Sequence, residues 1–333
     1  MCRHKMCSFG LVCMFHKIRD ITDLFDRGKA PMKKLIRPAM LLLPLVTGVF
    51  LPQLAFLAQE PYNFIRWALM GMIFLNLLQI NFADLKPCRE HFILLLVNIA
   101  LGIVPFWILK YTFPDSPVPA QAAFFTGIAP TAAAAAVVVS LLGGRTGFAV
   151  TGFVISNLGI ALALLFLLPL VTGNFSAAFF GNVFHTLVMV IAIPLLCART
   201  VRRFFPQILR YKERLKTVSL SLWSLSLLVI SSVARRNFDL NSGYAPGFLL
   251  LLIIIPLVLC IAGFAFGWLT ARKDYRRDAS QILGQKNTTF AIYIALEYAC
   301  TTVALAPIFY VLFHNLWNSI QLSLYKDKNR EKE

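Results

Sequence analysis

Long apolar segments separated by short polar connections make up most of this chain. An α-helix needs about 20 mostly apolar residues to cross a bilayer, and ten segments approach that length. The pattern predicts spanning helices at approximately residues 38–57, 64–82, 91–112, 119–142, 147–172, 177–198, 217–233, 246–270, 280–304 and 306–325. None of the connections is long enough to form a separate soluble domain. The predicted fold class is therefore an all-α membrane protein with ten transmembrane helices.

Composition and charge support a membrane location and give the chain a direction. Hydrophobic residues make up 58% of the chain and charged residues 14%, whereas soluble domains are about one quarter charged. The basic residues, which give a net charge of +17, form short clusters between apolar runs and not one nucleic-acid-binding surface. With the N-terminus inside, 27 of the 32 Lys and Arg residues fall in inside segments and 4 in outside segments. This asymmetry predicts a multi-pass cell (inner) membrane protein with both termini in the cytoplasm and no nucleic-acid partner.

The order of the segments divides the chain into two halves of five helices. The predicted parts are a cytoplasmic lead (1–33), a first five-helix repeat plus the sixth helix (34–198), a basic cytoplasmic loop (199–216), the remainder of the second repeat (217–325) and a charged cytoplasmic tail (326–333). Because five is an odd number, two homologous halves must insert with opposite orientation. Such inverted repeats are typical of secondary transporters, which bind substrate and ions near the bilayer midplane.

The lead contains three cysteines, Cys2, Cys7 and Cys13, and two histidines, His4 and His16. Their spacing matches no zinc-binding pattern, so neither a metal nor a cofactor is predicted. The short apolar run in the lead cannot span a bilayer, and no small-residue cleavage site follows it. The lead is therefore interpreted as cytoplasmic and not as a signal peptide.

Two of the predicted spans contain residues that interrupt a helix. In the fourth, Gly127-Ile-Ala-Pro130-Thr131 falls near mid-span, and proline removes a backbone donor and clashes with the preceding turn. In the ninth, Gly284-Gln285-Lys286-Asn287-Thr288-Thr289 forms a polar cluster in an apolar span. Interrupted helices at matching positions of two halves indicate a transport site, because broken backbone at membrane depth survives only beside a cavity or inside protein.

Lys286 is the strongest single candidate for a functional residue. An ammonium group near the bilayer centre costs on the order of 3 kcal/mol, so a carboxylate, helix carbonyls, water or an anionic substrate must offset it. Alternatively, the side chain extends to the cytoplasmic interface. Glu297, the second charge, lies roughly 16 Å further along a continuous helix. The candidate substrate- or ion-binding residues are Lys286, Asn287, Thr288, Gln285, Thr131, Pro130, Asn98, Glu297 and Asn315, and no catalytic residue is predicted.

The chain resembles the bile acid:sodium symporter family over about residues 34–325. Gly284-Gln-Lys-Asn287-Thr and the later Pro307-Ile-Phe-Tyr-Val-Leu-Phe-His314-Asn315-Leu316 are similar to that family's Gly-x-Gln-Asn-Ser element and its later His-Asn. Further pieces are Gly127 to Thr131 with Leu167-Leu-Pro169-Leu-Val, and Phe82-Ala-Asp84-Leu85-Lys86. The resemblance implies alternating-access transport of an organic anion. It also implies a panel domain (first, second, sixth and seventh helices) and a core domain in which the discontinuous fourth and ninth helices cross.

The sequence departs from this family where the resemblance places bound sodium. Ala135 and Ala136 stand in the places of the family's Ser-Asn pair, and Ala100, with Asn98 nearby, stands in the place of its third-helix Gln. Ile282 replaces the family's Glu, and Lys286 replaces a further Gln. Sodium needs several oxygen ligands, which alanine and isoleucine side chains lack. Two positive charges about 4 Å apart repel by about 4 kcal/mol at an effective dielectric constant of about 20.

These departures lead to the hypothesis that Lys286 replaces the sodium charge as a fixed or protonatable cation. The chain would then be a sodium-independent carrier of an organic anion: a uniporter, an exchanger or a proton-coupled carrier. Its partners would be the anion, membrane lipid and a proton or other coupling ion, in a monomer or homodimer. Three alternatives stay open: a sodium-coupled symporter, an arsenite-type permease with Thr131 as a poor ligand for soft arsenic, and an intramembrane enzyme, which would need an acid, base or metal constellation.

Overall fold

The computed structural model describes residues 43–59, 62–240 and 246–330. The predicted cytoplasmic lead and the start of the first predicted span lie outside these ranges. Every regular element within them is helical. A first helix covers residues 43–50, and the elements that follow are η1 (Pro52–Ala58), α3 (Phe64–Leu78), η2 (Phe82–Asp84), α4 (Arg89–Thr112), α5 (Val118–Gly127), α6 (Ala134–Leu141), α7 (Thr146–Thr172), α8 (Ala177–Leu187), the π-helix η3 (Val188–Ala192), α9 (Ile193–Phe204), η4 (Pro206–Tyr211), α10 (Lys212–Leu240), α11 (Pro246–Thr270), η5 (Lys273–Tyr275), α12 (Arg276–Gly284), α13 (Thr288–Tyr298) and α14 (Thr301–Arg330).

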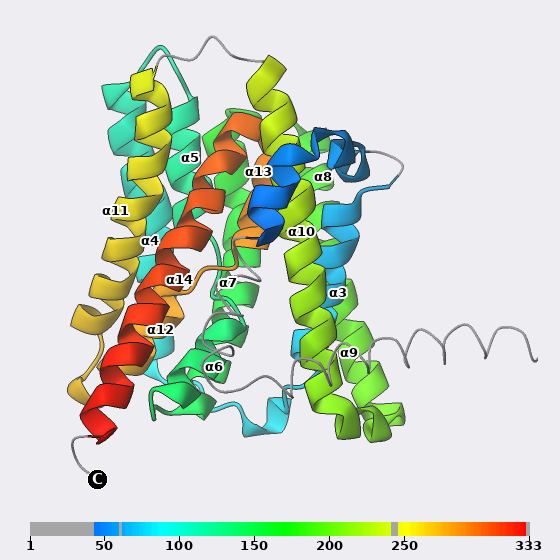
Figure 1. Ribbon diagram of the computed structural model, residues 1–333, viewed down its shortest axis with the longest axis vertical. Coiled ribbons are helices and arrows are strands. Elements are labelled where there is room, and N and C mark those ends of the chain that lie inside the picture. The colour runs from blue at the N-terminus through cyan, green and yellow to red at the C-terminus, as the bar shows by residue number, and fades with distance from the viewer. Residues whose placement is uncertain (1–42, 60–61, 241–245, 331–333) are drawn as a thin grey trace, which may run out of the picture.

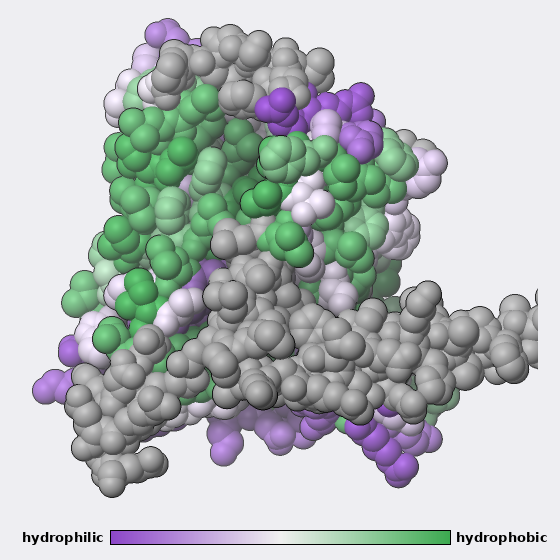
Figure 2. Space-filling model, in the orientation of Figure 1, coloured by the Kyte–Doolittle hydropathy of each residue, from purple (hydrophilic) through white to green (hydrophobic). Residues whose placement is uncertain are grey.

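Six helices in the described ranges are long and apolar enough to cross a membrane. They are Arg89–Thr112, Thr146–Thr172, Ala177–Phe204, Pro206–Arg236, Gly247–Thr270 and Thr301–Leu322. Figure 2 shows apolar residues over the middle of the molecule and hydrophilic residues toward its two ends. Large apolar side chains are exposed on the surface, among them Leu96 (66%), Phe166 (71%) and Ile261 (62%). Such a surface fits lipid as its solvent, and the fold is that of an all-α membrane protein.

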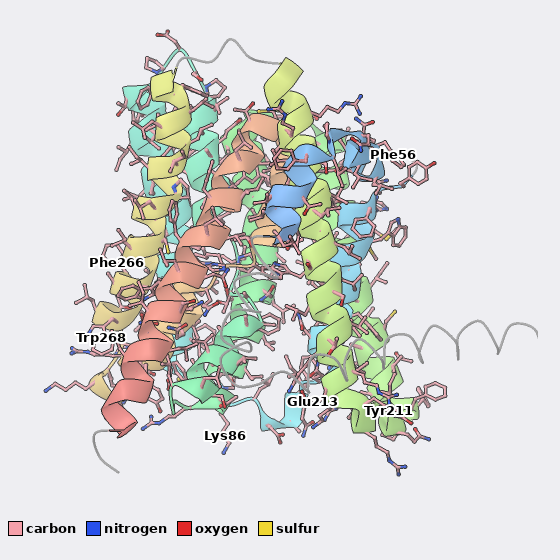
Figure 3. The ribbon with its side chains drawn as sticks, viewed as in Figure 1. Phe56, Lys86, Tyr211, Glu213, Phe266 and Trp268 are labelled. Carbon is pink, nitrogen blue, oxygen red and sulfur yellow. The ribbon has the colours of Figure 1, made fainter. Side chains whose placement is uncertain are left out.

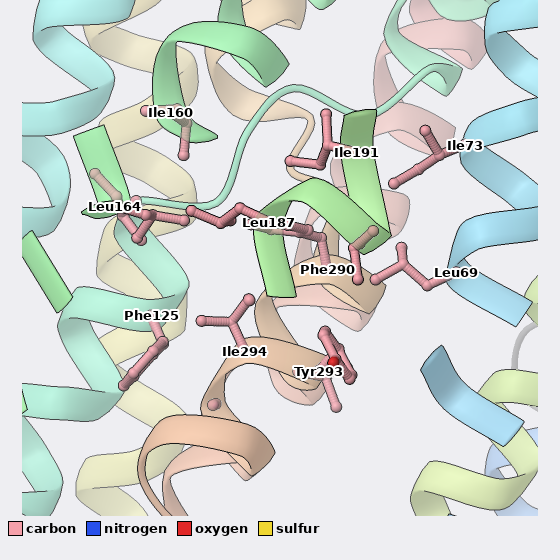
Figure 4. Packing of buried hydrophobic residues seen from close by; sticks show 14 of the residues in the cluster. Leu69, Ile73, Phe125, Ile160, Leu164, Leu187, Ile191, Phe290, Tyr293 and Ile294 are labelled. Atoms are coloured by element: carbon pink, nitrogen blue, oxygen red, sulfur yellow. The ribbon is translucent and has the colours of Figure 1, made fainter. Parts of the chain in front are cut away.

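The helices lie in two groups that meet near α13 and α14 (Figure 1). On one side α3 packs against α9 and α10, and on the other α4 packs against α5 and α7 while α11 packs against α12, α14 and α5. One large hydrophobic cluster joins the two groups. In Figure 4, Leu69 of α3, Leu187 and Ile191 of the α8–η3 helix, and Phe290 and Tyr293 of α13 lie in this cluster.

Residues 199–216, predicted to form a loop, are helical over almost their whole length. α9 continues to Phe204, η4 follows at once, and α10 begins at Lys212. Apolar side chains of this segment, Val201, Ile208 and Leu209, pack against the large hydrophobic cluster. Figure 3 places Tyr211 and Glu213 of this segment at the same end of the molecule as Lys86, and Phe56 at the opposite end.

The last two predicted spans also differ from their expected bounds. α13 ends at Tyr298 and α14 begins at Thr301, so the helices separate earlier than the prediction of 280–304 and 306–325. α14 also continues to Arg330, through most of the segment predicted as a tail. Neither residue at the break, Ala299 or Cys300, is glycine or proline, so no helix-breaking residue marks it.

Polar contacts fix α12 at the end of the molecule marked by Lys86. Asp278 in its first turn accepts a hydrogen bond from the backbone N–H of Arg145, with 3.1 Å between the heavy atoms. Arg272, in the connection that precedes α12, forms an ion pair with Glu90 at the start of α4. The hydrogen-bonded carboxylate of Glu90 raises the pKa of the Arg272 guanidinium above its usual value. These contacts tie α4, α7 and α12 together at this end of the molecule.

Candidate functional site

Two helices are broken in the middle of the molecule. α5 ends at Gly127 and α6 begins at Ala134, while α12 ends at Gly284 and α13 begins at Thr288. Both segments in which the sequence predicted an interrupted helix, residues 127–131 and 284–289, are therefore interrupted in the structure. Pro130 explains the first break because it has no backbone N–H to donate to the preceding turn. The backbone of the second break leaves the helix at Gln285, whose ψ of 99° is extended.

The two broken segments lie against each other and exchange backbone hydrogen bonds. The N–H of Ala132 donates to the carbonyl of Gln285 (2.8 Å), and the N–H of Asn287 donates to the carbonyl of Pro130 (2.7 Å). Thr131 and Lys286 thereby face each other in an isolated antiparallel bridge. Four backbone groups that the breaks release from helices are thus paired in the interior, where unpaired groups would be costly.

Two side chains of α7 and a backbone carbonyl of α12 complete the hydrogen bonding of Thr131. Its backbone N–H donates to the hydroxyl of Ser156 (3.0 Å), and its carbonyl accepts from the amide of Asn157 (2.9 Å). Its own hydroxyl donates to the carbonyl of Ile282 (2.7 Å). The sequence analysis did not identify Ser156 and Asn157 as site residues, although two adjacent polar residues in the apolar α7 were a usable signal.

Lys286 is buried at this contact, with 2% of its surface exposed. Its Nζ donates to the carbonyl of Gly127 (2.9 Å) and to the side-chain oxygen of Asn98. The amide nitrogen of Asn98 in turn donates to the carbonyl of Ala129 (3.1 Å). The alternative that Lys286 extends to the interface is therefore wrong, because its ammonium group points into the protein, toward α4 and the end of α5.

Two physical effects offset the cost of burying the ammonium group of Lys286. Gly127 is the last residue of α5, so the ammonium lies at the C-terminal, partially negative end of a helix dipole. Each hydrogen bond from a charged group contributes about 1.5–3 kcal/mol, and the ammonium makes two. Their sum matches the burial cost, which is on the order of 3 kcal/mol. A positive charge can therefore remain at this position without a carboxylate beside it.

The other predicted residues of the second break have structural contacts of their own. Gln285 is buried and donates to the side chain of Gln281 (2.9 Å). The Asn287 side chain caps α13 by accepting the N–H of Phe290 (3.2 Å). The N–H of Thr288, the first residue of α13, donates to the carbonyl of Lys286 (2.9 Å). All three residues therefore help to shape the broken segment.

The remaining two predicted residues lie apart from these contacts. Glu297 is exposed at the penultimate position of α13, and no ion pair joins it to Lys286; both residues belong to the described part of the chain. The amide of Asn315 donates to the carbonyl of Val311 within α14 (2.7 Å). Among the residues that the structure describes, no three His, Cys, Asp or Glu side chains gather closely enough to hold a metal ion.

An apolar pocket lies between α3 and α7, next to the first break. Seven apolar side chains and that of Asn157 line it, contributed by α3, η3, α9 and α7. Because Asn157 also bonds to the carbonyl of Thr131, the pocket touches one end of the contact between the breaks. Lys286 does not line this pocket.

Asn98→Leu should destabilise the protein by about 1–3 kcal/mol, because it leaves the carbonyl of Ala129 and one proton of Lys286 without a buried partner. The measurement is the midpoint of thermal unfolding in detergent. Asn81→Leu is the matched control, since Asn81 is exposed and bonds to Asp84. Equal midpoints for the two variants would contradict the assigned role of Asn98.

These features define the class of the molecule: an all-α membrane protein with two broken helices that meet around a buried, hydrogen-bonded lysine. No protein-family model and no curated protein matches the chain.

Proposed function

We propose that this protein is a secondary transporter that moves an organic anion by alternating access. In this proposal ten helices cross a cell (inner) membrane, both termini are cytoplasmic, and the two breaks belong to crossed, discontinuous fourth and ninth helices of inverted repeats. The reciprocal backbone hydrogen bonds of the two broken segments support this reading. The N–H of Ala132 in the first segment donates to Gln285 in the second, and the N–H of Asn287 in the second donates to Pro130 in the first. Discontinuous helices at the repeat interface are characteristic of such carriers. The resemblance to the bile acid:sodium symporter family enters here as part of the proposal.

The observation that carries the proposal is the position of the Lys286 ammonium group. A backbone carbonyl and an amide oxygen surround it, from Gly127 and Asn98, and these are oxygen ligands of the kind that a bound sodium ion would take. The side chains of Ala135 and Ile282, both buried, supply no oxygen. Lys286 therefore acts as a built-in cation in a sodium-independent carrier.

The apolar pocket beside Asn157 is where the proposal places part of the substrate. Its lining is apolar, but its volume of about 20 Å³ holds only one or two water molecules, so in the proposal this pocket widens during the transport cycle to take the body of an amphipathic carboxylate. The N-terminal ends of α6 and α13 begin just after the two breaks, and such ends carry partial positive charge that favours an anion. The substrate class is therefore an organic anion with an apolar body, and no enzymatic step is proposed.

No contact in the site favours the alternative functions over this one. The hydroxyl of Thr131, which an arsenite-type permease would use, is engaged with the carbonyl of Ile282. A sodium-coupled symporter would have to seat its ion beside the ammonium of Lys286, against a repulsion of about 4 kcal/mol at about 4 Å.

Uptake of radiolabelled benzoate, octanoate and cholate into proteoliposomes tests the proposal. We expect the purified protein to carry at least one of these anions at the same initial rate when sodium is replaced by N-methylglucamine. The reason is that the positive charge at the site is covalently attached and needs no ion from solution. An uptake that requires sodium would contradict the role given to Lys286, and uptake of none would contradict the proposed substrate class.

A further inference from the structure

The segment from the end of α9 to the start of α10 lies at a membrane surface. It joins two helices that are long and apolar enough to cross a membrane, Ala177–Phe204 and Pro206–Arg236. The residues around this junction therefore lie where the apolar part of the bilayer gives way to headgroups and water. Figure 3 places Tyr211 and Glu213 of this segment at one end of the molecule, and Figure 2 shows hydrophilic residues at that end.

The positive charge of this segment is not balanced by acidic residues. Residues 199–216 contain seven Lys and Arg residues and a single acidic residue, Glu213, which forms an ion pair with Lys216 (2.8 Å). The other two polar segments at this end, residues 84–90 and 272–278, contain six basic and four acidic residues between them. An excess of basic residues on one side of a membrane orients a chain, but it does not require this concentration on one segment.

Exposed aromatic rings lie among the basic side chains of the segment. The two phenylalanines are 66% and 62% exposed and the tyrosine 54%. The three basic side chains between and beside them are exposed, and none forms an ion pair with a residue that the structure describes. These six residues, which we call the cationic–aromatic surface, are Arg203, Phe204, Phe205, Arg210, Tyr211 and Lys212.

Packing on the opposite side of the segment holds this surface in place. Val201, Ile208 and Leu209 pack against the large hydrophobic cluster. Nη1 of Arg202 donates to the carbonyl of Leu78 at the end of α3 (3.1 Å). Because these contacts fix the backbone, the cationic–aromatic surface is preformed, and its residues lose little further freedom when they bind a partner.

We propose that the cationic–aromatic surface binds the headgroup of an anionic phospholipid. Its three cations are placed to attract the lipid phosphate, and its aromatic rings suit the boundary between headgroups and acyl chains, where such rings are enriched in membrane proteins. The position at the junction of two spanning helices favours a lipid over a soluble anion, because headgroups are its immediate neighbours. The inference does not depend on the transport function proposed above.

The test measures binding of fluorescent phosphatidylglycerol to the purified full chain in an uncharged detergent. We expect saturable binding that weakens as salt is added. The triple variant Arg203→Gln, Arg210→Gln and Lys212→Gln should bind the probe at least about tenfold more weakly, since each basic residue near an anionic lipid surface contributes roughly fivefold. Unlabelled phosphatidylglycerol should displace the probe, whereas equal concentrations of phosphatidylcholine or of soluble glycerol phosphate should not.

The matched control removes three positive charges from the other two polar segments at the same end. Lys86→Gln, Arg89→Gln and Lys273→Gln, combined in one chain, alter exposed residues and should leave the affinity for the probe unchanged. A second measurement is the midpoint of thermal unfolding, since a ligand that binds the folded protein raises it. Phosphatidylglycerol should raise the midpoint of the unaltered protein and of the control, and should have little effect on the first triple variant.

Four results would overturn the inference. The unaltered protein could fail to bind phosphatidylglycerol, or could bind phosphatidylcholine equally well. The two triple variants could retain the same affinity as each other, which would mean that only the total charge matters or that these residues do not matter. Finally, glycerol phosphate could displace the probe as well as the lipid does, which would indicate a site for a soluble anion.

Discussion

Lys286→Gln should reduce sodium-free anion uptake by about 100-fold. The substitution removes two charged hydrogen bonds, to Gly127 and Asn98, and with them about 3 kcal/mol or more. Each 1.4 kcal/mol corresponds to a factor of ten. Glutamine is similar in length and polar but uncharged, so the loss reports on the positive charge and not on packing alone. The measurement is the initial rate of uptake of the benzoate, octanoate or cholate that the unaltered protein carries.

Lys273→Gln provides the matched control for this substitution. Lys273 lies in η5 and is exposed, so its substitution by glutamine removes the same charge at a position away from both breaks. Its uptake rate should equal that of the unaltered protein. Both variants should elute as monodisperse species, so that a folding defect is recognised. If Lys286→Gln and Lys273→Gln transport equally well, the buried ammonium has no role in transport.

Gly127→Ala should both destabilise the protein and abolish transport. A Cβ atom at this position would lie 2.1 Å from the carbonyl oxygen of Leu101 and 3.0 Å from Cα of Gly102. Both are backbone atoms of α4, so no side chain can rotate away, and α5 must shift from α4. Overpacking of this kind costs about 1–3 kcal/mol. The shift also displaces the carbonyl that accepts from Lys286.

Gly147→Ala is the control for the glycine substitution. A Cβ at Gly147 meets no heavy atom within 4 Å, and alanine is the better helix former by about 1 kcal/mol. Its thermal midpoint in detergent should therefore equal or exceed that of the unaltered protein, while that of Gly127→Ala should fall. Equal midpoints and equal uptake rates for both variants would mean that the close approach of α4 and α5 is not needed.

Much of the fold follows from local sequence signals. Apolar runs such as residues 91–112 and 147–172 closely match α4 and α7, because a lipid-exposed helix must be apolar over its length. Pro130 marked the first helical break because it has no backbone N–H to donate, and the polar residues at 284–289 marked the second because they interrupt an apolar run. The helical turns of residues 199–216 did not follow from the sequence, because charges and apolar residues alternate there and packing against the rest of the protein decides their conformation.

Some residues of the candidate site could be predicted from the sequence, but their contacts could not. Lys286 stands out as a charge in an apolar span, and Asn98 was identified with it. One of the two acceptors of Lys286, however, is the backbone carbonyl of Gly127, and a residue's identity does not predict which backbone carbonyl its side chain will contact. Ser156 and Asn157, which hold Thr131, lie in a different helix 25 and 26 residues away. Such pairs are fixed by tertiary packing.

Binding of radioactive sodium to the purified protein tests most directly whether a lysine nitrogen has taken the place of the metal ion. We predict no saturable binding to the unaltered protein, because the oxygens of Gly127 and Asn98 already hold the ammonium group. Saturable sodium binding to the unaltered protein, lost on addition of unlabelled sodium and dependent on Asn98, would contradict this assignment.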